Sequence, residues 1–263
     1  MPLIGDRAVT SSAARFVWYE LMTDDLPAAQ AFYADVLGWK LRDAGMPGFT
    51  YLVAASAGGD RAGLMGIPPE AAGMSPFWCG YLGVADVDAM ARRLAQEGGT
   101  VQRPPEDIPG VGRFAVVADP QGAGFCLFTP AEGRMPPAPE AGEPGTVAWH
   151  ELYAGDMPAV FGFYETLFGW RRDRLMDMGA MGGYQIFLQQ DDLPGGMMTR
   201  TPEMPGPRWQ FYFAVDAIDA AVARLEAGGG TVLMGPHQVP GDTWVVQARD
   251  PQGALFALHA ARR

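Results

Sequence analysis

The sequence predicts an α+β protein of two tandem domains, each built from units of one strand, one helix and three strands. The first observation is a duplication: Trp-Tyr-Glu-Leu at 18–21 returns as Trp-His-Glu-Leu at 149–152, an offset of 131 residues. The turn signature Asp-Pro-Gln-Gly at 119–122 recurs at 250–253 with the same offset. The length of 263 residues also suits two domains of ordinary size.

The first unit begins at residues 16–22, which are short, apolar and aromatic, as expected of a strand. Asp25 is placed to accept hydrogen bonds from the first amides of a helix, and Gly38 is placed to end it. These two residues predict a helix over 26–37. Short strands are predicted over 51–54 and 63–67, separated by a glycine-rich turn.

The second unit repeats this scheme, and the later half of the chain repeats both units. Its helices are predicted near 158–168 and 216–227. A proline-rich stretch over 131–145 has the composition of an exposed linker. The predicted organisation is therefore a tail over 1–14, a first domain over 15–130, the linker, and a second domain over 146–263. For the second unit, the predicted elements are a strand over 77–84, a helix over 86–97, and strands starting at 100, over 114–118 and over 124–129.

Composition excludes several classes of partner. The formal net charge of −11 disfavours nucleic acid and anionic membranes, because both attract basic surfaces. No unbroken apolar run has membrane-spanning length, and the first residues lack the apolar core of a signal peptide. A cytoplasmic monomer or homodimer that binds a small molecule, with no nucleic-acid or membrane partner, is expected.

The motifs resemble one protein family. A strand, Asp, a helix with Phe-Tyr, and Gly-Trp are followed about eighty residues later by Asp-Pro-x-Gly and an apolar strand. This order is similar to the vicinal oxygen chelate superfamily, which includes glyoxalase I, bleomycin and fosfomycin resistance proteins and extradiol dioxygenases. The resemblance covers nearly the whole chain in two copies. It implies four βαβββ modules, paired into two half-open barrels that each enclose a cup.

The resemblance implies a glyoxalase-like protein that binds, and in catalytic members transforms or detoxifies, a small carbonyl-bearing or aromatic metabolite. Catalysis of this kind would be lyase-like. The alternative is a non-catalytic protein of the bleomycin-resistance type that sequesters a drug or antibiotic. An extradiol dioxygenase is less favoured, because it needs two histidines and one carboxylate, which Gln210 and Ala257 do not supply.

The resemblance also implies where ligands would stand, on the inner faces of the first and last strands of the modules. Only one of these positions holds a ligand standard for the metal enzymes of the family, so no stoichiometric iron, nickel or manganese is expected. The inner first-strand positions are Tyr19, Cys79, His150 and Gln210, and the last-strand positions are Cys126 and Ala257.

His150 is the candidate catalytic base, because a neutral imidazole acts as a base or a ligand near pH 7. The alternative is a hydrogen-bonded histidine without chemistry, since Tyr19 replaces it in the first repeat. If module three pairs with module two, Cys79 and Cys126 would face His150, and the three could hold zinc or another divalent metal, or the imidazole could activate a thiolate. Two buried cysteines without a role are the alternative.

The other expected ligand-binding residues follow from strand alternation. His259 is expected to share a face with Ala257 and to line the pocket, and Trp244 is expected at its rim. By the same alternation, Glu20 and Glu151 are expected to point away from the cups. The two cups should be unequal, with ligand binding in the His150 cup following a histidine pKa of about 6.5.

Overall fold

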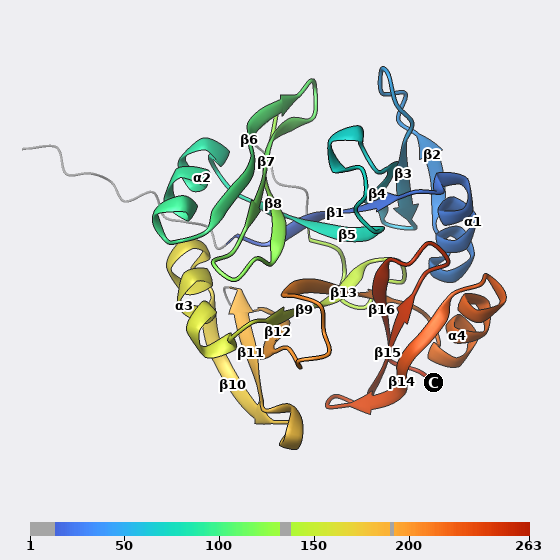
Figure 1. Ribbon diagram of the computed structural model, residues 1–263. Helices are drawn as coiled ribbons and strands as arrows, with labels where there is room; N and C mark the ends of the chain where they lie inside the picture. The colour runs from blue at the N-terminus through green and yellow to red at the C-terminus, as the bar shows by residue number, and fades with distance from the viewer. Residues whose placement is uncertain (1–13, 132–137, 190–191) are drawn as a thin grey trace, which may run out of the picture.

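The computed structural model describes residues 14–131, 138–189 and 192–263, which fold as two eight-stranded sheets (Figure 1). The first sheet and its helices comprise β1 (Phe16–Thr23), α1 (Leu26–Leu37), β2 (Lys40–Asp43), β3 (Tyr51–Ser56), β4 (Gly59–Gly66), β5 (Phe77–Gly83), α2 (Val87–Gln96), β6 (Thr100–Ile108), β7 (Gly112–Ala118) and β8 (Gly124–Pro130). The second comprise β9 (Val147–Ala154), α3 (Met157–Phe168), β10 (Arg171–Asp177), β11 (Gly183–Gln189), β12 (Asp192–Thr199), β13 (Arg208–Ala214), α4 (Ile218–Ala227), β14 (Thr231–Val239), β15 (Thr243–Arg249) and β16 (Leu255–Ala260). Single 3-10 turns lie at Pro69–Ala71 and Gly179–Met181.

Each half of the chain forms its own sheet. The strand orders are β2-β3-β4-β1-β5-β8-β7-β6 and β10-β11-β12-β9-β13-β16-β15-β14. The predicted α+β fold with tandem domains is confirmed, and the sheets are open, not closed barrels. Module one pairs with module two and module three with module four, so the conditional pairing of modules two and three is wrong. In Figure 1 each sheet curves around its central strands, and the two concave faces point away from each other.

α1 begins and ends where the sequence predicts, and the other three helices do so to within two residues. Asp25 Oδ1 accepts the amide of Ala28 at 3.0 Å at the start of α1, and Gly38 ends the helix with φ of +71°. This positive φ is one that glycine adopts without steric cost. The helix spans Leu26–Leu37, as predicted. α3 repeats the arrangement, with Asp156 at its start and Gly169 at its end.

The helices lie at the seam between the two sheets, where α1 packs beside α4 and α2 beside α3 (Figure 1). Tyr33 of α1 donates to Asp250 Oδ2 at 2.9 Å, and Tyr164 of α3 donates to Asp119 Oδ2 at 2.9 Å. Each half therefore places a helix against the Asp-Pro-Gln-Gly turn of the other half. One contiguous hydrophobic core spans both halves.

The described end of the predicted linker is attached to the first half. Glu143 accepts hydrogen bonds from Ser56 Oγ at 2.6 Å and Gly58 N at 2.9 Å, and forms an ion pair with Arg61 at 2.8 Å. The predicted tail lies outside the described residues except for Ala14, as do residues 132–137 of the linker. Within the described part of the chain, no helix has the length and apolar character needed to cross a membrane.

Candidate functional site

The side chains of β1 and β9 that lie on the concave side of each sheet are not those expected from the sequence. In the antiparallel pairing of β1 with β5, Glu20 lies opposite Cys79 and Tyr19 opposite Gly80. Directly opposed residues share a face, so Glu20 stands with Cys79 on the concave side. Tyr19 points to the back of the sheet. The prediction that Tyr19 faces the cup and Glu20 faces away is therefore wrong, and the same holds for His150 and Glu151 in β9, because Gln210 lies opposite Glu151.

Tyr19 and His150 meet at the seam, where the backs of the two sheets pack together. The Tyr19 hydroxyl lies 2.6 Å from His150 Nε2, and His150 Nδ1 lies 2.7 Å from the Pro194 carbonyl oxygen. A carbonyl only accepts, so Nδ1 carries the proton and Nε2 accepts from Tyr19. The Phe16 ring stacks on the imidazole with centroids 4.6 Å apart. Burial lowers the pKa of His150 to about 4.

This position removes His150 from the predicted zinc set. Cys79 and Cys126 lie on the concave side of the first sheet, whereas His150 lies behind it. Within residues 14–131, 138–189 and 192–263, no three His, Cys, Asp or Glu side chains gather in a way that could hold a metal ion. The set of His150, Cys79 and Cys126 is therefore wrong as a metal site.

The first concave face holds a buried carboxylate between two tyrosines. Tyr81 donates to Glu20 Oε1 at 2.9 Å and Tyr51 donates to Oε2 at 3.1 Å. Trp18 Nε1 in turn donates to the Tyr51 hydroxyl at 3.0 Å. Burial raises the pKa of Glu20, although the two tyrosine hydrogen bonds act in the opposite direction.

The rest of the first face is mainly apolar. Cys79 and Cys126 are free thiols whose sulfurs lie 3.6 Å apart. Its hydrogen bond with Cys79 and burial both raise the pKa of Cys126. The two cysteines belong to a buried cluster with Tyr81 and Phe114, against which Val17, Trp18, Phe77, Ile108, Val116 and Phe128 pack.

The second concave face repeats the carboxylate with more polar neighbours. Glu151 is 6% exposed, and its Oε2 accepts a hydrogen bond from the Tyr212 hydroxyl at 2.5 Å. Gln247 Nε2 donates to the hydroxyls of Tyr212 at 2.7 Å and Tyr153 at 2.5 Å. Gln247 stands where the first half has Val116, 131 residues earlier.

A tryptophan and a second tyrosine complete the repeat. Trp149 Nε1 donates to the Tyr184 hydroxyl at 2.8 Å, as Trp18 donates to Tyr51 in the first half. These tyrosines were not among the residues predicted from the sequence. The duplication was the available signal, since the Trp, the Glu and one of the two Tyr recur at the same offset of 131.

The remaining predicted residues separate between the two sides of the second sheet. Gln210 lies opposite Glu151, and Ala257 lies beside Tyr212, so both belong to the second concave face. His259 shares the face of Ala257, two positions along β16, and burial lowers its pKa. Trp244 is three positions from Gln247 and therefore faces the back, where the guanidinium of Arg263 lies 4.9 Å from its ring. The expected place of Trp244 at the cup rim is wrong.

The concave faces do not fit a divalent metal held by histidines and carboxylates. Gly63 of β4 lies beside Glu20, and a Cβ on Gly63 would stand 2.0 Å from the Tyr51 hydroxyl. A Cβ on Gly196, beside Glu151, would stand 2.2 Å from the Tyr184 ring. The tyrosine rings thus occupy the space that a ligand side chain would need at both positions.

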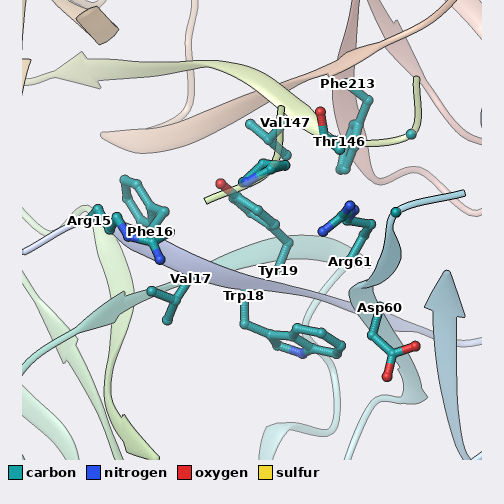
Figure 2. A pocket seen from close by; sticks show the side chains of 13 residues that line it. Arg15, Phe16, Val17, Trp18, Tyr19, Asp60, Arg61, Thr146, Val147 and Phe213 are labelled. Atoms are coloured by element: carbon teal, nitrogen blue, oxygen red, sulfur yellow. The ribbon is translucent and has the colours of Figure 1, made fainter. Parts of the chain in front are cut away.

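A cavity of about 350 Å³ lies at the seam, between β1, the turn before β4 and the start of β9 (Figure 2). Its charged and polar groups already have partners. Arg61 pairs with Glu143, Asp60 pairs with Arg42 at 2.7 Å, and Tyr19 bonds to His150. The cavity therefore offers mainly apolar contacts.

Known proteins are similar to this chain in sequence and in fold. The chain is 35% identical over 246 residues to CFP32, a proposed glyoxylase of Mycobacterium bovis, with 92% of each chain covered. It is 32% identical over 259 residues to the anthracycline biosynthesis protein DauV of a Streptomyces species, covering 92% of this chain and 91% of DauV.

Two solved structures share the fold at low sequence identity. The Mn(II)-bound glyoxalase from Novosphingobium aromaticivorans matches with a TM-score of 0.66 and 18% identity, covering 96% of this chain and 83% of the other. Homoprotocatechuate 2,3-dioxygenase from Arthrobacter globiformis matches with a TM-score of 0.68 and 18% identity, covering 95% and 80%. At this identity the likeness concerns the fold alone.

The family assignment follows from a match that occurs twice. The profile of the Glyoxalase/Bleomycin resistance protein/Dioxygenase superfamily matches residues 15–127 and again residues 146–258. These two segments coincide with the two sheets and their helices, and the expected resemblance is confirmed. The chain belongs to the Glyoxalase/Bleomycin resistance protein/Dioxygenase superfamily, as a member with two tandem domains.

Proposed function

We propose that the second concave face binds a small carbonyl compound and moves a proton at the carbon next to its carbonyl group. The observation that carries this proposal is the buried Glu151 carboxylate, held by Tyr212 within a network that includes Gln247 and Tyr153. A carboxylate removed from water is a suitable general base, and hydroxyl donors next to it stabilise negative charge that develops on oxygen. The name of CFP32, a proposed glyoxylase, supports a carbonyl-bearing substrate.

The proton transfer needs only groups of this chain. Glu151 takes the proton from the carbon, the C–H electron pair forms a carbon–carbon double bond, and the carbonyl electron pair moves to oxygen. The Tyr153 hydroxyl accepts from Gln247 and bonds to Glu151, and once Glu151 has taken up the substrate proton it turns its own proton to that enolate oxygen. Return of a proton to carbon completes an exchange or an isomerisation, with no net oxidation.

The first concave face is less suited to this chemistry. Met22 stands where the second half has Tyr153, the proposed donor to the enolate oxygen, and the Tyr51 and Tyr81 hydroxyls of the first face both donate to Glu20. Its surroundings are the apolar cluster around Cys79, Cys126 and Phe114. This cluster favours a second candidate function, the binding of an apolar aromatic molecule without catalysis.

Hydrogen–deuterium exchange tests the proposal. Phenylacetone, a neutral aromatic ketone, is incubated with the protein in D₂O, and loss of the signals of the protons next to the carbonyl is followed by NMR. The wild type should accelerate exchange, and Glu151→Gln should lower the rate by about 100-fold or more, the usual contribution of a general base. Glu20→Gln, the same change in the first face, should keep most of the rate.

Two outcomes would contradict the proposal. Exchange no faster than in buffer would remove the catalytic function, and with phenylacetone still bound it would favour the second candidate. Equal losses from Glu151→Gln and Glu20→Gln would show that the second face has no special part in the reaction.

A further inference from the structure

Arg208 stands at the start of β13 with hydrogen-bonding capacity that the protein does not use. It lies opposite Tyr153 in the pairing with β9, so it faces the second concave side, where its guanidinium lies 4.9 Å from the Tyr153 ring centroid. Its Nε and Nη1 are buried without a hydrogen-bond partner. Within the described parts of the chain, no carboxylate forms an ion pair with it.

Unused buried donors are unfavourable unless something else accepts from them. A buried donor without an acceptor costs free energy, more so when it is charged, and such groups are rare in folded proteins. Burial accordingly lowers the pKa of Arg208. The first half carries Phe77 at the equivalent position, packed against the apolar cluster. The fold itself therefore does not require a guanidinium here.

The spacing between Arg208 and Glu151 limits the kind of molecule that could accept hydrogen bonds from Arg208. Gln210 lies directly opposite Glu151, and Arg208 is two residues before it on the same face. Diagonal neighbours across antiparallel strands stand about 7–8 Å apart, a distance that an arginine side chain spans. A molecule that reaches both Glu151 and Arg208 thus carries an anionic group a few bonds from its acidic C–H.

We propose that Arg208 binds the carboxylate of the substrate and that the second concave face is selective for small 2-oxo acids over neutral carbonyl compounds. This inference rests on the proposed function, because Glu151 supplies the second point of contact. A planar guanidinium with free donors matches the geometry of a carboxylate. The first face, with Phe77 at this position, lacks the selectivity.

Calorimetric titration with phenylpyruvate and with its methyl ester tests the selectivity. The wild type should bind the acid more tightly than the ester. Arg208→Leu should weaken binding of the acid by about tenfold or more, the range for hydrogen bonds to a charged group, and leave the ester unchanged. Arg208→Lys keeps the charge without the planar fork, so its affinity for the acid should lie between those of the wild type and Arg208→Leu. Arg172→Leu is the matched control, because Arg172 also lies over a ring, Phe161, at 4.1 Å, but on β10.

Each remaining outcome overturns the inference. It fails if the wild type binds neither probe, if it binds the ester as tightly as the acid, or if Arg172→Leu has the same effect as Arg208→Leu. A purely structural role would appear as a lower melting temperature of Arg208→Leu with both probes weakened alike. The two proposals can also fail separately. If Glu151→Gln abolishes phenylacetone exchange but Arg208→Leu still prefers the acid, the proposed function stands and only this inference is refuted.

Discussion

At the scale of single residues, His150 shows how burial can turn a residue with catalytic chemistry into a structural one. Its two ring nitrogens are bonded to Pro194 and Tyr19, and Phe16 covers its face. Protonation would put a donor proton on Nε2 in place of the acceptor that Tyr19 needs. Ligand binding with a midpoint near pH 6.5, expected of this residue from the sequence, does not suit a histidine whose pKa burial lowers to about 4.

The first stability prediction concerns His150. Between its ordinary value of 6.5 and about 4, the unfolded chain binds a proton at this residue and the folded chain does not. Its contribution to stability is therefore present above pH 6.5 and lost as the pH falls toward 4, by at most about 1.4 kcal/mol per pH unit. Urea unfolding across this range should give a flatter profile for His150→Gln than for the wild type.

A histidine elsewhere provides the comparison. His237 is exposed on β14, and His237→Gln should leave the wild-type profile between pH 4 and 6.5 unchanged. Parallel profiles for wild type and His150→Gln would mean that His150 titrates in the folded protein as it does in the unfolded chain. The seam would then be hydrated at this point.

At the scale of elements, each concave face depends on a glycine under a tyrosine. Gly63→Ala would place a Cβ 2.0 Å from the Tyr51 hydroxyl and push the ring away from Glu20. Overpacking of this kind costs about 1–3 kcal/mol, and Glu20 would also lose a donor. We expect a lower free energy of unfolding in urea. Gly66→Ala is the control on the same strand, since a Cβ there meets nothing within 4 Å; an equal loss from both changes would point to strand propensity as the cause.

The helix boundaries could be predicted from the sequence to within two residues, but β2 was not predicted, β4 begins four residues before its predicted start, and the faces of β1 and β9 were wrong. The helix over 26–37 is signalled by local chemistry at Asp25 and Gly38. Residues 18–21 show no apolar–polar alternation, because the back of the sheet is buried against the other half and the concave side is aromatic as well. A shift in register near Phe16, repeated in β9, further disturbs alternation counted from the strand start.

The same uncertainty about strand faces limited what could be predicted of the candidate site. Cys79, Cys126 and Gln210 were placed on the concave side correctly, because β5, β8 and β13 were assigned the right faces. The networks around Glu20 and Glu151 were not predicted, since they join residues from β3, β5 and β15 whose proximity depends on sheet order. Sheet order is a property of long-range pairing, which local sequence patterns do not encode.

At the scale of the whole molecule, buried contacts join the two tandem domains. Tyr33 donates to Asp250 and Tyr164 donates to Asp119, so each half supplies a buried hydrogen bond to the other. Both aspartates are almost fully buried, at 3% and 1% exposure, and burial raises the pKa of each. The shared hydrophobic core also joins the two halves. The duplication could be found in the sequence, but this exchange of contacts could not.

The last prediction follows from these exchanged contacts. Because separating the halves would expose the shared core and leave Asp119 and Asp250 short of a donor, the chain should unfold in a single calorimetric transition. Tyr33→Phe and Tyr164→Phe should each lower the stability of the whole chain by about 1–3 kcal/mol, the cost of a buried acceptor that loses its donor. The two variants remove equivalent bonds of 2.9 Å, so each serves as the control for the other. Scanning calorimetry should show the single peak moving without splitting. Two separate transitions in the wild type, or a variant that shifts only part of the heat absorption, would show that the halves fold independently.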